Sequence, residues 1–160
     1  MHPSLKDVQF FPSKRKWKTQ SDGELRVLFQ VPHDKALAYL ETSPEHPSPD
    51  IRGLRAYMVD GLMKGKVGGK EFHKIRKEFF SVTRGSLDIE VKDVEGNSKV
   101  YAVGKGECLL IPPYILHTYT VKEENTSFVV VASTTFDPDD EETHDTYAEE
   151  LFFKMQGKKR

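Results

Sequence analysis

EFHKIRKEFFSVTRG (residues 71–85) and GECLLIPPYILH (residues 106–117) are the two runs of sequence that decide the fold. Side chains two apart on a strand point to the same side, so Glu71 and His73 are expected to share one face. Glu78 and the distant His117 can join them if the strands that carry them pair. The two runs therefore predict four acid–base or metal-binding groups directed into one cavity.

The residues from 78 to 133 show the period of two that is typical of strands. Leu87, Ile89 and Val91 fall on one face of residues 86–92, and polar or charged residues alternate with them. We expect strands over residues 78–83, 86–92, 99–103, 107–111, 117–121 and 127–133. Strands this short and this closely spaced predict an all-β sandwich or barrel.

The flanking residues complete a single domain over residues 1–160, a length that suffices for one hydrophobic core. Residues 1–20 are expected to form an extended arm with a short strand at 8–11. This arm would pair across a homodimer, because it has little core of its own. Other expected elements are strands over 24–31 and 51–59, a helix over 36–41, a proline-rich loop over 42–50 and a flexible glycine-rich loop over 61–69. Residues 137–160 are expected to hold an acidic linker and a helix over 146–155.

The composition argues against several classes of function. The chain has 24 basic and 25 acidic residues, and its formal net charge of −1 gives no reason to expect binding to nucleic acid or a membrane surface. No apolar run approaches the roughly 20 residues that span a bilayer, and we see no signal peptide. The single cysteine, Cys108, excludes an intramolecular disulfide, so we expect a cytoplasmic protein.

The predicted cavity has the groups that proton transfer needs. If Glu78 begins an inward-facing strand, Phe80 follows it inside, while His117 and Tyr119 share the inner face of a later strand. Burial disfavours the charge of a carboxylate, and a protonated histidine nearby compensates for it. Such pairs suit general acid–base catalysis near neutral pH. The four groups of the cavity are also ligand types for a divalent metal such as Mn, Fe, Ni or Zn.

The spacing of these residues resembles the paired motifs of the cupin superfamily. The first run reads Glu-x-His-x4-Glu-x6-Gly from Glu71 to Gly85, and the second reads Gly-x5-Pro-x4-His from Gly106 to His117. Cupins usually begin the first motif with His-x-His, and Glu71 stands in the place of the first histidine. Tyr114 stands where the second motif usually has glycine. The resemblance implies an RmlC-like jelly-roll β-barrel, here with a short C-terminal helix.

Residues 51–59, 71–74, 130–133 and 136–137 resemble segments of a narrower cupin group that is similar over nearly the whole chain. This group contains the sugar-nucleotide 3,4-ketoisomerases and the dTDP-4-keto-6-deoxysugar 3,5-epimerases. The resemblance implies an isomerase or epimerase of polysaccharide biosynthesis that acts on a nucleotide-linked 4-keto-6-deoxysugar. Its chemistry would be proton abstraction and reprotonation, with no cofactor required.

The same resemblance implies roles for individual residues. His73 matches one of the two catalytic histidines of the ketoisomerases, and Glu71 replaces the other. His73 would then be the acid–base residue, with Glu71 or Glu78 as the partner that orients it or carries the proton. The residues expected to bind the substrate are Tyr57, Lys74, His117 and Tyr119.

Two other functions stay open. Residues 111–117 also resemble metal-binding cupins, namely the archaeal phosphoglucose isomerases, and glutamate can ligate a metal where histidine does. The second hypothesis is therefore a metal-dependent sugar isomerase or oxygenase, with ligands Glu71, His73, Glu78 and His117. The third is a sugar-binding cupin without catalysis, because the first motif histidine is missing.

Overall fold

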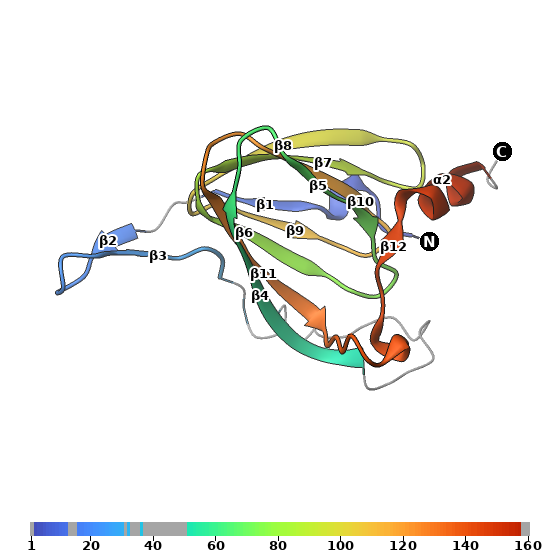
Figure 1. Ribbon diagram of the computed structural model, residues 1–160, viewed down its shortest axis with the longest axis horizontal. Coiled ribbons are helices and arrows are strands. Elements are labelled where there is room, and N and C mark those ends of the chain that lie inside the picture. The colour runs from blue at the N-terminus through green and yellow to red at the C-terminus, as the bar shows by residue number, and fades with distance from the viewer. Residues whose placement is uncertain (1, 13–15, 31, 33–35, 37–50, 158–160) are drawn as a thin grey trace.

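The computed structural model describes residues 2–12, 16–30, 32, 36 and 51–157, and it shows two antiparallel sheets packed face to face (Figure 1). The first sheet has the strand order β1-β9-β6-β11-β4, and the second has the order β12-β5-β10-β7-β8. This architecture confirms the all-β prediction. No helix in the described ranges is long and apolar enough to span a membrane.

The strands and helices have the following bounds: η1 (Leu5–Asp7), β1 (Gln9–Phe11), β2 (Lys16–Lys18), β3 (Glu24–Arg26), β4 (Arg52–Leu62), β5 (Val67–Phe72), β6 (Glu78–Arg84), β7 (Ser86–Lys92), β8 (Ser98–Gly104), β9 (Cys108–Ile111), β10 (Leu116–Val121), β11 (Thr126–Thr134), η3 (Glu141–Thr143), β12 (Tyr147–Ala148) and α2 (Glu149–Gly157).

The core lies between the two sheets and follows from the alternation of the strands. On β7 the residues Leu87, Ile89 and Val91 are buried, and their neighbours in the strand are half-buried. Fully burying one such side chain contributes roughly 1.5–3 kcal/mol, so the inner faces fix the register of the sheets. The other strands add buried residues to the same cluster, among them Phe80, Val82, Leu109, Ile111, Val121, Phe128 and Val130.

The C-terminal segment covers the edge of the second sheet. Tyr147 and Ala148 of β12 pair with Phe72 and Glu71 of β5. The buried ring of Phe152 on α2 packs edge-on against Phe72, with ring centroids 5.3 Å apart. The prediction of a helix from residue 146 was therefore wrong at its start, because residues 147–148 extend the sheet before the helix begins.

Two further boundaries differ from the predictions. Residues 61–69 are not one flexible loop, because β4 continues to Leu62 and β5 begins at Val67. The short turn between them contains Gly65, which supplies a positive φ of 82°. The strand predicted over 24–31 ends at Arg26, where its pairing with β2 ends. The predicted helix over 36–41 lies outside the described residues except for Ala36, and the predicted loop over 42–50 lies wholly outside them.

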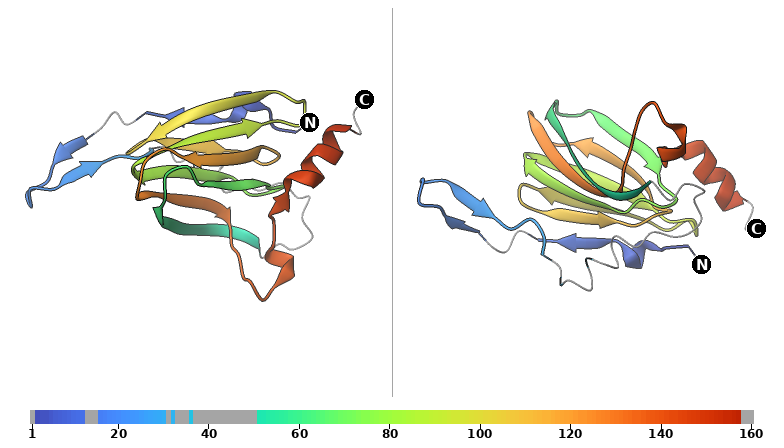
Figure 2. Two further views of the ribbon diagram at one scale, coloured as in Figure 1. Left: turned by 45° about the horizontal axis from the view of Figure 1, so that its top comes forward. Right: turned by 90° about the horizontal axis from the view of Figure 1, so that it is seen from below.

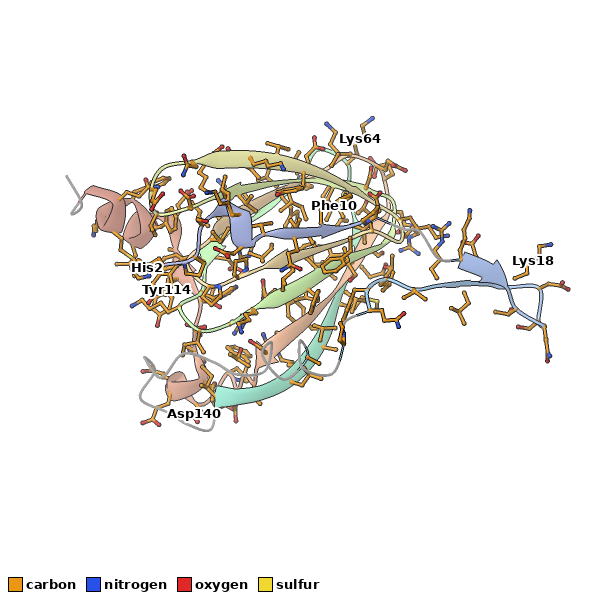
Figure 3. All side chains as sticks on the ribbon, turned by 180° about the vertical axis from the view of Figure 1, so that it is seen from behind. His2, Phe10, Lys18, Lys64, Tyr114 and Asp140 are labelled. Atoms are coloured by element: carbon orange, nitrogen blue, oxygen red, sulfur yellow. The ribbon has the colours of Figure 1, made fainter. Side chains whose placement is uncertain are left out.

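The N-terminal arm divides into two parts. Strand β1 pairs with β9 of its own chain, whereas the hairpin of β2 and β3 extends away from the barrel (Figure 2). Figure 3 places Lys18 of this hairpin well outside the body that contains Tyr114.

Candidate active site

Strands β5 and β10 bring Glu71 and His117 together. The two residues are directly opposite each other in the ladder, and a bulge follows at once, between His117 and Thr118. Gly69 lies at this bulge and has a positive φ of 78°. A Cβ atom at this position would collide with the carbonyl oxygen of His117, so the position requires glycine. A glycine is also required at position 68, since the ring of Tyr119 lies where a Cβ atom would be. These two glycines let β5 approach β10 closely beside the site.

His73 reaches the same place by a different route from the one predicted. Strand β5 ends at Phe72, so His73 is in the loop after it and shares no strand face with Glu71. The loop nevertheless turns the imidazole inward, where it is buried with 2% of its surface exposed. One ligand atom from each of Glu71, His73 and His117 lies within 4.8 Å of the other two.

Glu78 begins β6 in the opposite sheet and joins the two histidines. Its Oε2 atom lies 3.4 Å from Nε2 of His73 and 3.6 Å from Nε2 of His117. Its Oε1 atom accepts a hydrogen bond of 3.0 Å from the hydroxyl of Tyr57 and lies 3.7 Å from Nη1 of Arg76. The carboxylate is 1% exposed, so its charge depends on these partners.

The pKa values of this network follow from burial and charge. Burial alone would raise the pKa of Glu78, but His73 first, and then His117 and Arg76, hold it well below its usual range. Burial alone would lower the pKa of His73, but the Glu78 carboxylate outweighs it and raises that pKa. At His117 the effect of burial outweighs the attraction of the Glu78 carboxylate and lowers the pKa of the imidazole. The site therefore holds an ionised Glu78, a His73 that favours its proton and a neutral His117.

Both imidazoles are fixed through their other nitrogen atom. Nδ1 of His73 is 2.6 Å from the backbone oxygen of Asp145, and Nδ1 of His117 is 3.2 Å from that of Ile115. A carbonyl oxygen can only accept, so both Nδ1 atoms must carry a proton. Each Nε2 atom consequently faces the carboxylate of Glu78. Nε2 of His73 has no hydrogen-bond partner among the described residues, although it lies at ion-pair distance from that carboxylate.

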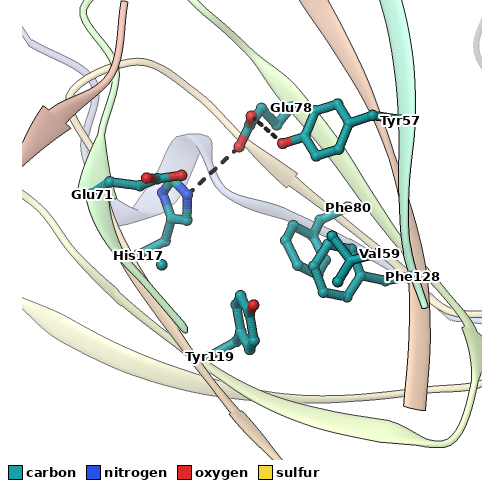
Figure 4. Close-up of a pocket in the computed structure, with 9 residues that line it drawn as sticks. Tyr57, Val59, Glu71, Glu78, Phe80, His117, Tyr119 and Phe128 are labelled. Atoms are coloured by element: carbon teal, nitrogen blue, oxygen red, sulfur yellow. Dashed lines mark hydrogen bonds and ion pairs between the residues drawn. The ribbon is translucent and has the colours of Figure 1, made fainter. Parts of the chain in front are cut away.

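A cavity of about 130 Å³ opens beside this network (Figure 4). Glu71 and His117 form one wall, while Glu78 and Tyr57 lie across from them. The rest of the lining is mostly apolar or aromatic: Val59, Gly69, Phe80, Tyr119 and Phe128.

Two of the residues predicted to act on the substrate lie outside this lining. His73 is not part of the lining, although its Nε2 atom lies 3.4 Å from Oε2 of Glu78. Lys74 places its ammonium group over the ring of Tyr147, 4.3 Å from the ring centroid. Sequence reasoning also missed Arg76, which is 4% exposed and ion-paired with Glu78. The sequence indicated this role of Arg76 only by a charged residue close to the motif residue Glu78.

Replacing Tyr57 with phenylalanine is expected to lower the free energy of unfolding by about 1.5–3 kcal/mol, because Glu78 loses a buried hydrogen bond to a charged group. Chemical denaturation of both proteins measures the difference. Tyr101→Phe on β8 serves as the control and is expected to change stability by no more than about 0.5 kcal/mol. Equal stabilities of Tyr57→Phe and the wild type would show that this hydrogen bond contributes nothing.

A comparison with protein families assigns most of the chain. The profile of the family described as "FdtA: WxcM-like, C-terminal" matches residues 34–151. The chain belongs to this family. No curated protein sequence matches the chain.

Solved structures of this fold confirm the predicted RmlC-like cupin barrel. A mutant of the 3,4-ketoisomerase QdtA from Thermoanaerobacterium thermosaccharolyticum, in complex with TDP-4-keto-6-deoxyglucose, is 21% identical, with a TM-score of 0.64 over 96% of each chain. The TDP-quinovose 3,4-ketoisomerase WlaRB from Campylobacter jejuni is 17% identical, with a TM-score of 0.63 over 93% of this chain and 98% of the other. The dTDP-4-dehydrorhamnose 3,5-epimerase from Bacillus anthracis, with TDP and PPi bound, is 13% identical, with a TM-score of 0.62 over 87% and 79%.

Proposed function

We propose that this protein is an isomerase or epimerase that acts on a nucleotide-linked 4-keto-6-deoxysugar. The observation that carries the proposal is the convergence of Glu71, Glu78, His117 and two tyrosines on one small cavity. The relatives named above add support, because they share the barrel and two of them bind TDP or a TDP-linked keto-sugar.

The proposed reaction removes a proton from the carbon beside the sugar's carbonyl and returns it to another carbon or to the other face. Glu71 is placed to carry this proton, because its carboxylate lines the cavity and none of the hydrogen bonds seen in the described residues engages it. Burial and the charge of Glu71 raise the pKa of Tyr119. Tyr119 therefore keeps its phenolic proton and can donate a hydrogen bond to the negative charge that develops on the carbonyl oxygen.

Glu78 and His73 have supporting roles in this proposal. Glu78 is an ionised carboxylate that accepts from Tyr57 and faces both imidazoles. His73, predicted from the sequence as the acid–base residue, does not line the cavity and supplies the charge that compensates Glu78. Together Glu78 and His73 keep the charge on this wall of the cavity constant while Glu71 takes the proton from the sugar and returns it.

The size of the cavity indicates which part of the substrate enters it. Pockets for drug-sized ligands measure roughly 300–1,000 Å³, and this one measures about 130 Å³. The reacting sugar ring would occupy it, and the nucleotide would lie outside its mouth.

The test of this function is turnover of TDP-4-keto-6-deoxyglucose, followed by proton NMR of the sugar. We expect a new keto-sugar isomer or epimer with the wild type and none with heat-denatured protein. Binding of the nucleotide-sugar without any conversion would favour the sugar-binding hypothesis instead.

A second candidate is a metal-dependent sugar isomerase or oxygenase. Glu71, His73 and His117 satisfy the distance requirement for a shared metal ion, with Glu78 at their side. Metal-binding histidines usually donate their second ring nitrogen to a carbonyl or carboxylate, as both imidazoles do here. The buried Nε2 of His73 without a hydrogen-bond partner also fits a ligand atom. Such a set suits Mn, Fe, Ni or Zn, which would polarise the substrate's carbonyl when bound.

Metal removal separates the two candidates. If a metal is bound, EDTA is expected to lower the melting temperature of the wild type, and Glu71→Gln to weaken Mn²⁺ binding at least about tenfold because an anionic ligand is lost. Elemental analysis and thermal melts with and without EDTA measure both effects. Asp88→Asn is the control, since Asp88 pairs with Lys122 on the surface. A wild-type melt that EDTA leaves unchanged, with no metal co-purifying, would eliminate the metal-dependent candidate.

We also propose that the protein is a homodimer. Strand β4 is the edge of its sheet, and its outward residues Leu54 and Met58 are each 63% exposed. The hairpin of β2 and β3 extends from the barrel, and an isolated two-stranded hairpin has little stability of its own. A second copy would cover both features.

Replacing both Leu54 and Met58 with aspartate is expected to convert the dimer into a monomer, because the new charges would be buried at the interface. Light scattering coupled to gel filtration measures the mass of each protein. Lys99→Asp on the edge strand β8 is the control and should leave the mass unchanged. A monomeric wild type would contradict the dimer.

A further inference from the structure

The C-terminal segment reaches the candidate site through Asp145. This residue precedes β12 and is fully buried, with 0% of its surface exposed. It lies close to the loop between β5 and β6, from which it is separated by about 70 residues of sequence. An aspartate buried to this extent requires partners for its charge.

The carboxylate of Asp145 holds three successive backbone N–H groups of that loop. Oδ1 accepts from Lys74 at 2.9 Å, while Oδ2 accepts from Ile75 at 2.9 Å and from Arg76 at 2.7 Å. The backbone oxygen of the same residue accepts from Nδ1 of His73 at 2.6 Å. One residue therefore fixes both the path of the loop and the proton position on His73.

The consequence for the site is geometric. Because Nδ1 must donate to a carbonyl oxygen, the Nε2 atom of His73 is directed at Glu78. If the ring turned over or the loop shifted, the Nε2 atom of His73 would no longer lie 3.4 Å from Oε2 of Glu78. The residues after Asp145 support the same arrangement: Thr146 accepts from Arg76 at 3.4 Å, and Ala148 pairs with Glu71.

We propose that Asp145 is a positioning residue that sets the tautomer and orientation of His73, and with them the direction of its Nε2 atom toward the carboxylate of Glu78. The effect on turnover rests on the function proposed above, whereas the effect on His73 does not. The C-terminal segment is thus a part of the site and not only a cover for the sheet edge.

The chain offers a matched control in Asp93, at the turn between β7 and β8. Asp93 is 1% exposed, and its carboxylate accepts from the backbone N–H groups of Glu95 at 3.1 Å and Asn97 at 2.9 Å. Asp93 is not part of the cavity lining. Asp145→Asn and Asp93→Asn therefore remove the same kind of buried anchor, one at the site and one away from it.

Nitrogen-15 NMR of the imidazoles tests the proposal without any substrate. In the wild type we expect His73 to carry a proton on Nδ1, in slow exchange with water. In Asp145→Asn we expect the His73 signals to shift, whereas in Asp93→Asn they should match the wild type. A wild-type His73 protonated only on Nε2 would overturn the proposal even if neither variant folds, and so would unchanged His73 signals in Asp145→Asn.

Kinetics provide the second measurement. We expect Asp145→Asn to lower kcat by about 10- to 100-fold with little change in KM, by analogy with the loss of the outer hydrogen-bond partner of a metal-binding histidine. Asp93→Asn should melt at a lower temperature and keep its kcat. Equal kcat values for Asp145→Asn and the wild type would overturn the link to turnover. If the wild type converts no keto-sugar, the proposed function fails, while the NMR result still decides the role of Asp145.

Discussion

Replacing Glu78 with alanine is expected to lower the free energy of unfolding by about 3–5 kcal/mol, because removing one partner of a buried ion pair leaves the others without compensation. The groups left behind are Arg76 and His73, which are 4% and 2% exposed. Tyr57 also loses the acceptor of its hydrogen bond. Chemical denaturation near pH 6 measures the loss.

The pH dependence of this loss follows from the directions of the two pKa shifts. The folded state lowers the pKa of Glu78, so its stabilisation is present above about pH 4.3, the unfolded value, and is lost as the pH falls toward the folded value. The folded state raises the pKa of His73, so its stabilisation is complete below about pH 6.5 and is lost as the pH rises through the folded value. The difference in the free energy of unfolding between the wild type and Glu78→Ala should therefore be largest between about pH 4.3 and 6.5.

A surface ion pair gives the comparison for this variant. Asp88→Ala removes a carboxylate that pairs with Lys122 at 3.0 Å, and we expect it to cost no more than about 1 kcal/mol. If Glu78→Ala lowered the free energy of unfolding by as little, or by the same amount at all pH values, the charges of His73 and Arg76 would not depend on Glu78 for compensation.

Replacing Glu71 with glutamine is expected to lower kcat by about 10²- to 10⁴-fold, the usual contribution of general acid–base catalysis. Glutamine keeps the shape of the side chain but cannot accept the proton. Since Glu71 is half-buried and lines the cavity, the fold should tolerate the change. Steady-state kinetics with TDP-4-keto-6-deoxyglucose measure the effect.

The conservative variant Glu71→Asp is the control for Glu71→Gln, because it keeps a carboxylate and should keep more of the activity. A kcat for Glu71→Gln close to that of the wild type would show that another group carries the proton. His117 would be the next candidate, since its imidazole also lines the cavity.

The sequence predicted the part of the site that depends on strand geometry. The spacing of the two motifs implied that Glu71 and His117 could lie on paired strands, and they are direct partners in the ladder of β5 and β10. It also predicted that Glu78 begins an inward-facing strand, as β6 does. A period of two is a property of any strand, so the inward face could be predicted without tertiary information. The pairing of β5 with β10 is a long-range contact, and the prediction assumed it as a condition.

The parts that depend on irregular backbone could not be predicted in the same way. His73 was expected on the strand that carries Glu71, but β5 ends one residue earlier and the loop supplies the orientation. That loop is held by Asp145, whose contacts join residues about 70 positions apart. Neither period nor spacing in the sequence encodes such a contact. The short strand β12 was missed for a related reason, because two residues give no detectable alternation.

Solvent deuterium incorporation tests the central claim most directly. The wild-type protein is incubated with TDP-4-keto-6-deoxyglucose in deuterium oxide, and the sugar is analysed by NMR and mass spectrometry. The proposed proton transfer predicts deuterium at a carbon adjacent to the carbonyl, together with isomerised or epimerised product, and loss of both with Glu71→Gln. Recovery of the sugar unchanged and free of deuterium would contradict the claim that this cavity moves protons beside a carbonyl.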